Sequence, residues 1–587
     1  MRNHFVANTR CAKCSKDLAS FAKSSHSRFP LFYNRVWVRL GVAATTTRGR
    51  HVSQSAVVRR VWSNSASGYV RSAVRLILGV IAFRLICAEF SMEKLGFYGL
   101  VWSFLGYGVL LDFGMGVAIK KRTAELMQRE DWNMLGRVLS SVLLCNCVCA
   151  VIFAAVGLAA ADPLLRAIDV SPANQTDFRA ALRVFVVGMA AMFPLEMFRE
   201  VHYGQQRMAF ADCASTVAGI ISFALLVVAL RMNWGLSLII CAQFTPLVVT
   251  GVVLVISALR AMPEVRLGIQ YVSWDVLRGI ARFSALAFLM VLAGIVVLQT
   301  DRVLVGAVLS VSAVATYHIG AKVPELFATF TRQLPDALAP ATAALQGECH
   351  RAGLQRFFGQ AIRLNALIST PLFLLCMLFI EGLLRLLTRG RAVGPDVVFL
   401  SRILLVWTYS TILTHGISKP VFLMSGHEGR LLRLLVIEAL ANVVMSFILL
   451  QWLESPVGAA LGSLAPALLI GWCFLWPWAA REIGTTSVGL ARQALVPAFR
   501  ASGPLLAFGV SCRIVPTLDF RSDITVFLVE AIAALTIAAI GTWYFGLAAG
   551  ERTAVIAKVT RMVTGMRSFS WFGIGTYYSR IRQGKPE

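Results

Sequence analysis

The chain has 587 residues, of which 57% are hydrophobic and 15% charged, and its formal net charge is +26. Its mean hydropathy of +0.70 excludes a water-soluble globular protein, because a soluble chain of this length divides into domains with charged surfaces. The apolar residues come in runs of about twenty, long enough to cross about 30 Å of hydrocarbon as an α-helix. We therefore predict an all-α membrane protein with about 14 transmembrane helices.

The predicted spans follow one another closely, and several are apolar on every face, which is typical of lipid-exposed or deeply buried helices. Barrel strands would instead alternate apolar and polar residues. The first span is the least regular, because Arg75, Arg84 and Glu89 interrupt it. The predicted spans are residues 73–90, 97–119, 136–161, 180–202, 210–230, 234–259, 279–300, 308–333, 361–388, 397–424, 431–453, 456–480, 494–516 and 524–549.

Basic residues gather in alternate connections. If the N-terminus is cytoplasmic, the even-numbered connections are cytoplasmic too, and these include the basic segments 120–122, 260–282 and 430–433. The connections near 166–183 and 385–391 are also basic, which weakens the contrast without reversing it. The positive-inside rule predicts that both termini lie in the cytoplasm. Because topology accounts for the charge, we expect no nucleic-acid partner.

The two ends of the chain differ from its middle. Residues 1–70 are basic and rich in Ser and Thr, and we interpret them as a disordered or spurious N-terminal extension. Cys11 and Cys14 there form only half of a zinc site, so neither a metal nor another cofactor is expected. Residues 551–587 form a predicted basic cytoplasmic tail, positioned to contact membrane lipids of an anionic leaflet.

The spans divide into two sets of six and a final pair. The predicted domains are an N-lobe at 71–260, a C-lobe at 261–482 and helices 13 and 14 at 483–550. Six-helix halves in the same orientation imply a pseudo-twofold axis along the membrane normal. Transporters built from such halves bind their substrate between them.

Two long segments resemble a known family. Residues 98–116 (YGLVWSFLGYGVLLDFGMG), followed by 120–125, resemble the opening signature of polysaccharide-transporter proteins. These include the O-antigen and teichuronic-acid flippases of the multidrug/oligosaccharidyl-lipid/polysaccharide exporter superfamily. Residues 299–306, followed by 314–320, are similar to the segment that opens the second lobe in that family.

Two shorter segments extend the resemblance over roughly 70–480. Residues 340–345 resemble the P-x-x-S-x-L connector of the family, with Ala343 in place of the usual serine, and 458–462 resemble its glycine-rich entry to the twelfth span. The resemblance implies two six-helix lobes around a central cavity. It also implies a flippase in the bacterial inner membrane that moves polyprenyl-pyrophosphate-linked oligosaccharide to the outer leaflet, for polysaccharide, lipopolysaccharide or O-antigen export. Expected partners are the lipid-linked oligosaccharide, a polysaccharide polymerase and glycosyltransferases.

Flipping a pyrophosphate requires a hydrated cationic path, because bare charge is very costly in hydrocarbon. Arginine and lysine inside spans are the expected phosphate ligands. For Arg302 the alternative is a structural ion pair with a neighbour such as Asp301, and for Arg199 a local pair with adjacent glutamates. The candidate substrate-binding residues are Arg84, Lys322, Arg302, Arg199 and Lys419.

Titratable residues inside spans are candidates for ion coupling. Asp112 and Glu438 could carry a proton or a cation, and His318 could titrate near neutral pH. The alternative for each is a hydrogen bond that holds neighbouring helices together.

Three functions fit the sequence: a lipid-linked oligosaccharide flippase, a cation-coupled multidrug or small-molecule antiporter with an acidic cavity, and a non-transporting scaffold of glycan assembly. An enzyme is not expected, because the sequence has no Walker A, G-x-S-x-G or H-E-x-x-H motif.

Overall fold

The computed structural model describes residues 73–108, 115–167, 170–205, 207–332, 351–390, 393–424, 427–514, 524–547 and 551–553. In this part of the chain the regular structure is helical and contains no strand. The first described helix covers residues 73–89. The others are α4 (Met92–Gly108), α5 (Met115–Gln128), α6 (Trp132–Ala167), α7 (Pro172–Gly204), α8 (Met208–Arg231), α9 (Leu236–Arg260), α10 (Trp274–Val308), α11 (Val311–Thr331), α13 (Arg351–Leu378), α14 (Ile380–Thr388), α15 (Pro395–Met424), α16 (Glu428–Leu453), α17 (Val457–Ile470), α18 (Trp476–Ile483), α19 (Ser487–Ile514) and α20 (Ile524–Gly541), with the short helical turns Ile269–Tyr271, Gly471–Leu475 and Thr542–Gly546.

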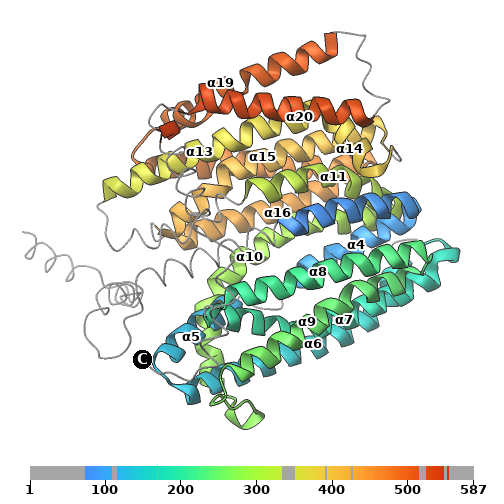
Figure 1. Cartoon of the computed structure of the whole chain (residues 1–587), viewed down its shortest axis with the longest axis vertical. Helices are drawn as coiled ribbons and strands as arrows, with labels where there is room; N and C mark the ends of the chain where they lie inside the picture. The colour runs from blue at the N-terminus through green and yellow to red at the C-terminus, as the bar shows by residue number, and fades with distance from the viewer. Residues whose placement is uncertain are drawn as a thin grey trace, which may run out of the picture.

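The helices form two groups (Figure 1). In the first, α5 to α9 pack on one another; in the second, α11 and α13 to α18 do so, and α19 and α20 cover its outer side. Helices α4 and α10 lie between the groups, since α4 packs on α7, α10 and α11, and α10 packs on α5, α6, α11 and α16. This arrangement places α4 and α10 next to both groups. The predicted lobe boundaries themselves stay predictions.

Each of the fourteen predicted spans overlaps described helical residues. Eleven of the described helices are long and apolar enough to cross a membrane. The helix at 73–89, α4 and α11 are not among them. Helix α11 contains His318, Lys322 and Glu325, which lower its mean hydropathy. Polar residues of this kind inside a membrane protein face the protein interior rather than lipid.

The ninth predicted span, 361–388, is two helices in the structure. Helix α13 ends at Leu378 and α14 begins at Ile380. Helix α14 is strongly amphipathic: it buries Ile380, Leu384 and Leu387 and carries the exposed pair Glu381–Arg385 (2.8 Å). A helix of 9 residues is too short to cross the hydrocarbon, and an amphipathic one is suited to the membrane interface.

Small residues let α16 and α17 approach closely. Gly458 and Gly462 are four residues apart, so they share one face of α17. A Cβ atom at Gly462 would lie 2.4 Å from the Cα atom of Ser446, and one at Gly458 would lie 2.5 Å from the carbonyl oxygen of Leu449. Glycine at both positions therefore permits a helix contact that no larger residue fits. After α17 a π-helical turn, Gly471–Leu475, joins it to α18.

We predict that Gly462→Ala destabilises the protein. The added methyl group would overlap the α16 backbone, and overpacking typically costs about 1–3 kcal/mol. The measurement is the thermal unfolding midpoint of the purified protein in detergent. Gly219→Ala is the matched control, since a Cβ atom there meets nothing within 4 Å. Equal unfolding midpoints for both variants would contradict the proposed role of the contact.

Candidate functional site

A buried carboxylate lies where four helices meet. Asp301 of α10 is 3% exposed, and its side chain accepts hydrogen bonds from three hydroxyl groups. The donors are Tyr317 of α11 (2.7 Å), Ser463 of α17 (2.6 Å) and Ser446 of α16 (3.2 Å). Burying a charged group is costly unless it is hydrogen-bonded. These three hydroxyls therefore meet that requirement and fix α10, α11, α16 and α17 to one point.

The next residue along the chain, Arg302, belongs to a second cluster. Its guanidinium pairs with Glu325 of α11, and the Nζ atom of Lys322 lies 3.1 Å from the other oxygen of the same carboxylate. Two cations share one anion, so this triad of Arg302, Lys322 and Glu325 carries one net positive charge when all three groups are ionised. The side chains of Arg302, Lys322 and Glu325 are 11%, 21% and 39% exposed, so the triad is partly accessible.

Residues from the first part of the chain complete the surroundings of the triad. The Lys322 Nζ atom lies 4.9 Å from the ring centre of Phe83, and His318 packs edge-on against the same ring at 5.4 Å. The Arg302 guanidinium also reaches the Ser103 hydroxyl of α4 at 3.5 Å. The triad thus lies at a junction between helix 73–89, α4, α10 and α11. An ammonium over an aromatic face is stabilised without neutralising its charge.

Arg84 makes a different contact. Its guanidinium donates to the backbone carbonyl of Leu386 in the last turn of α14. The last four carbonyls of a helix have no partner within the helix, and a cation there also interacts favourably with the helix dipole. The structure therefore gives Arg84 a structural role in joining the first helix to α14.

The other two predicted cations lie apart from the triad. Arg199 of α7 forms an ion pair with Glu196 (2.6 Å) and lies 3.8 Å from Glu200, which is the local arrangement that its sequence neighbours indicated. Lys419 of α15 is close enough to interact electrostatically with Glu438 and Arg332. The structure thus brings Arg302 and Lys322 together but separates Arg199 and Lys419 from them.

The structure also places two of the predicted ion-coupling residues, Glu438 and His318, in different clusters. Glu438 of α16 is buried at 4% exposure and lies 2.8 Å from the Nε2 atom of His415, whose Nδ1 atom is 2.9 Å from the Thr414 hydroxyl. His318 is buried beside the triad. Asp112, like the connector at 340–345 and the extension 1–70, lies outside the residues that the structure describes.

Two carboxylates of the site have more contacts than the sequence indicated. Asp301 was considered only as a partner for Arg302, yet it bonds to three hydroxyls, and the partner of Arg302 is Glu325. The three-residue spacing of Lys322 and Glu325 on one helix face was a usable signal. Nothing local in the sequence links Ser446 and Ser463 to Asp301, because their distance along the chain is long.

A family model described as "Polysaccharide biosynthesis protein" matches residues 84–388, slightly more than half of the chain. This chain belongs to that family. The matched region contains Arg84, Asp301, the whole triad and His318. None of the curated proteins compared with the chain matches it.

Several solved membrane transporters share the fold. The lipid II flippase MurJ in an inward closed conformation aligns with a TM-score of 0.59 and 11% identity, over 82% of this chain and 98% of that chain. An inward-facing multidrug resistance MATE family transporter of the MOP superfamily aligns with a TM-score of 0.57 and 16% identity, over 71% and 96%. A MOP superfamily transporter from Pyrococcus furiosus, described by the reverse polarity of its binding pocket, aligns with a TM-score of 0.55 and 16% identity, over 72% and 95%. At these identities the likeness shows the fold: the chain is a multi-pass membrane protein with a transporter architecture.

The triad predicts non-additive effects on stability. We expect Glu325→Gln to lower the thermal unfolding midpoint more than Lys322→Gln, because it leaves two cations without their shared anion. The double variant Lys322→Gln with Glu325→Gln should recover part of the loss, since only Arg302 then lacks an anionic partner. A double-mutant cycle on unfolding midpoints in detergent measures this coupling. Strictly additive shifts would contradict a shared ion-pair network.

Proposed function

We propose that this protein flips lipid-linked oligosaccharide, carried on a polyprenyl pyrophosphate, from the cytoplasmic to the outer leaflet. The supporting observation is the triad of Arg302, Lys322 and Glu325, because it holds surplus positive charge where α4 and α10, the helices between the two groups, meet α11. Membership of a polysaccharide biosynthesis family and a fold shared with a lipid II flippase agree with this substrate class.

In the proposed mechanism, the substrate pyrophosphate replaces a carboxylate as the partner of a cation. Glu325 pairs with both cations and balances one of their two positive charges while no substrate is present, which lowers the cost of holding them in a membrane protein. An incoming pyrophosphate offers several anionic oxygens, so it can replace the carboxylate as a partner of Lys322, the more exposed of the two cations. The lipid tail stays in hydrocarbon throughout. Lys322 is thus the proposed phosphate ligand, and Arg302 is the cation that keeps Glu325 in place.

The cellular setting is part of the same proposal. The protein would act in the bacterial inner membrane, and the basic connections favour an orientation with both termini in the cytoplasm. The glycan would serve polysaccharide export, including lipopolysaccharide or O-antigen assembly, next to a polymerase and glycosyltransferases.

A second candidate is a cation-coupled antiporter. The observation that favours it is the buried pair of Glu438 and His415, a carboxylate and an imidazole 2.8 Å apart inside the second helix group. Such a pair can exchange a proton between its members. This reading places the chemistry on Glu438 rather than on Lys322.

We predict that Lys322→Ala lowers flipping by about ten- to hundredfold, because a hydrogen bond to a charged group contributes about 1.5–3 kcal/mol. The assay is transbilayer movement of a fluorescent polyprenyl-pyrophosphate sugar in liposomes that contain the purified protein. Lys322→Arg should retain part of the activity. Arg183→Ala is the control, since Arg183 forms a partly exposed surface pair with Asp162 (3.7 Å). Full activity in Lys322→Ala would exclude Lys322 as the phosphate ligand.

A parallel assay distinguishes the two candidates. Liposomes loaded with a cationic dye should show no protein-dependent dye efflux if the flippase proposal holds. Glu438→Gln and Asp112→Asn should then change the dependence of flipping on pH or sodium only if these carboxylates couple transport to an ion. Dye efflux without movement of the lipid-linked sugar would favour the antiporter.

A further inference from the structure

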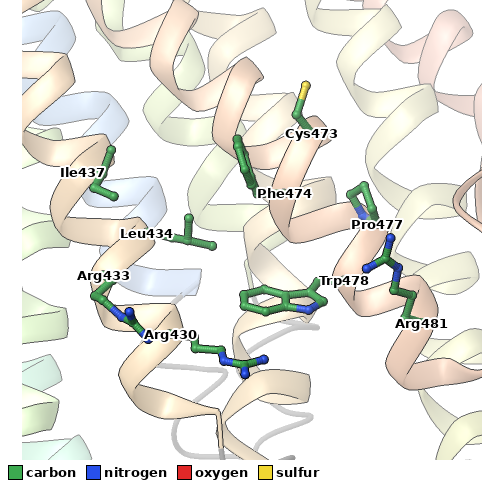
Figure 2. A pocket seen from close by; sticks show the side chains of 9 residues that line it. All are labelled: Arg430, Arg433, Leu434, Ile437, Cys473, Phe474, Pro477, Trp478 and Arg481. Carbon is green, nitrogen blue, oxygen red and sulfur yellow. The ribbon is translucent and has the colours of Figure 1, made fainter.

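A cavity of about 480 Å³ lies between the start of α16 and α18. Figure 2 shows its layered lining: Arg430, Arg433 and Arg481 lie toward one end, and Ile437, Cys473 and Phe474 toward the other. Trp478 extends across the arginine end. The cavity therefore has a cationic end and an apolar end, as a phospholipid site requires.

A second cavity of about 610 Å³ lies between the start of α8 and the end of α9. Arg207, directly before α8, and Arg260, the last residue of α9, line it together with Phe210, Val253 and Ile256. The chemistry of the two linings is the same: arginines from two segments of the chain and an apolar wall with an aromatic ring.

The two cavities occupy equivalent places in the predicted repeat. Helices α8 and α9 correspond to the fifth and sixth predicted spans, and α16 and α17–α18 to the eleventh and twelfth. In both cases the cavity lies where the fifth helix of its set begins and the sixth ends. This is the face that the basic connections assign to the cytoplasm.

The aromatic rings hold the guanidinium groups against the cavity walls. The Arg430 guanidinium carbon lies 5.4 Å from the ring centre of Trp478, and that of Arg207 lies 5.9 Å from the ring centre of Phe210. A cation–π contact orients an arginine without using its N–H donors. Those donors can still bind a phosphate bidentately.

The described residues leave the positive charge of both cavities without an acidic partner. Within the described ranges, none of the five lining arginines forms an ion pair with a carboxylate, and no acidic residue lines either cavity. The nearby acid Glu482 faces His427 at 3.7 Å. Exposed cationic groups of this kind are complementary to an anionic headgroup.

The apolar walls continue as exposed surface that an acyl chain can cover favourably. Ile437 is 55% exposed and Phe474 is 48% exposed beside the first cavity, and Val253 and Ile256 are each 44% exposed beside the second. These side chains belong to helices long and apolar enough to cross the membrane. An acyl chain that lies along them continues directly from a headgroup held by the arginines.

We propose that the two cavities are a symmetry-related pair of binding sites for anionic phospholipids at the cytoplasmic face. The arginines bind the headgroup phosphate and the apolar walls bind the upper part of the acyl chains. The proposal is independent of the flipped substrate, since both cavities lie away from Arg302, Lys322 and Glu325 in sequence and in lining.

The test is native mass spectrometry of the full chain, purified from nanodiscs that contain phosphatidylcholine and phosphatidylglycerol. We expect the protein to retain up to two phosphatidylglycerol molecules in preference to phosphatidylcholine. The variant Arg430→Gln, Arg433→Gln, Arg481→Gln should lose one, Arg207→Gln with Arg260→Gln should lose the other, and the combined variant should lose both. Arg183→Gln with Arg385→Gln is the control and should retain both.

Three outcomes would overturn the proposal. They are equal retention of the two lipids, unchanged retention in the combined variant, and displacement of phosphatidylglycerol by inorganic phosphate alone, which would indicate a small-anion site. Gel filtration checks that each variant is folded, and Arg→Lys versions, which keep the charge, should retain most of the lipid. Because no lipid-linked sugar is present, the result does not depend on whether the protein is a flippase.

Discussion

The structure depends on how one carboxylate is satisfied in a medium without water. Asp301 is buried and receives hydroxyl hydrogen bonds from α11, α16 and α17. Burying any one of these polar groups alone in hydrocarbon would cost free energy, and the hydrogen bonds among them offset that cost. The same contact requires α16 and α17 to approach closely, which Gly462 permits. The close packing of α16 on α17 and the burial of the Asp301 carboxylate therefore depend on each other.

The position of Asp301 on α10 also determines where the triad of Arg302, Lys322 and Glu325 lies. Asp301 and Arg302 are adjacent on α10, so their side chains point in different directions: one toward α16 and α17, the other toward Glu325 on α11. The first is fully enclosed, whereas the triad is partly accessible. A rigid anchor next to an exchangeable ion pair is an arrangement in which a substrate anion can compete for cations while the surrounding helices stay in register.

Much of the fold could be predicted from apolar periodicity, because in a bilayer every backbone group must be satisfied within its own helix. The broken ninth span was missed, since its hydropathy does not reveal that α14 is a separate amphipathic helix after α13. The site was predictable only in part. Lys322 and Glu325 share a helix face and could be paired from spacing, but Arg84 could not be assigned to the carbonyl of Leu386, 302 residues away. Long-range partners depend on packing that a single sequence does not display.

The π-helical turn at Gly471–Leu475 sets the rotation of α18 about its own axis. Such a turn contains one residue more than an α-helical turn, so it rotates the following helix by about 100° relative to an uninterrupted α-helix. In this protein the following helix carries Trp478 and Arg481. Removal of any one residue from the turn would restore a regular helix and rotate both side chains off the wall that faces α16. The length of this segment, more than its composition, therefore specifies which face of α18 lines the cavity beside α16.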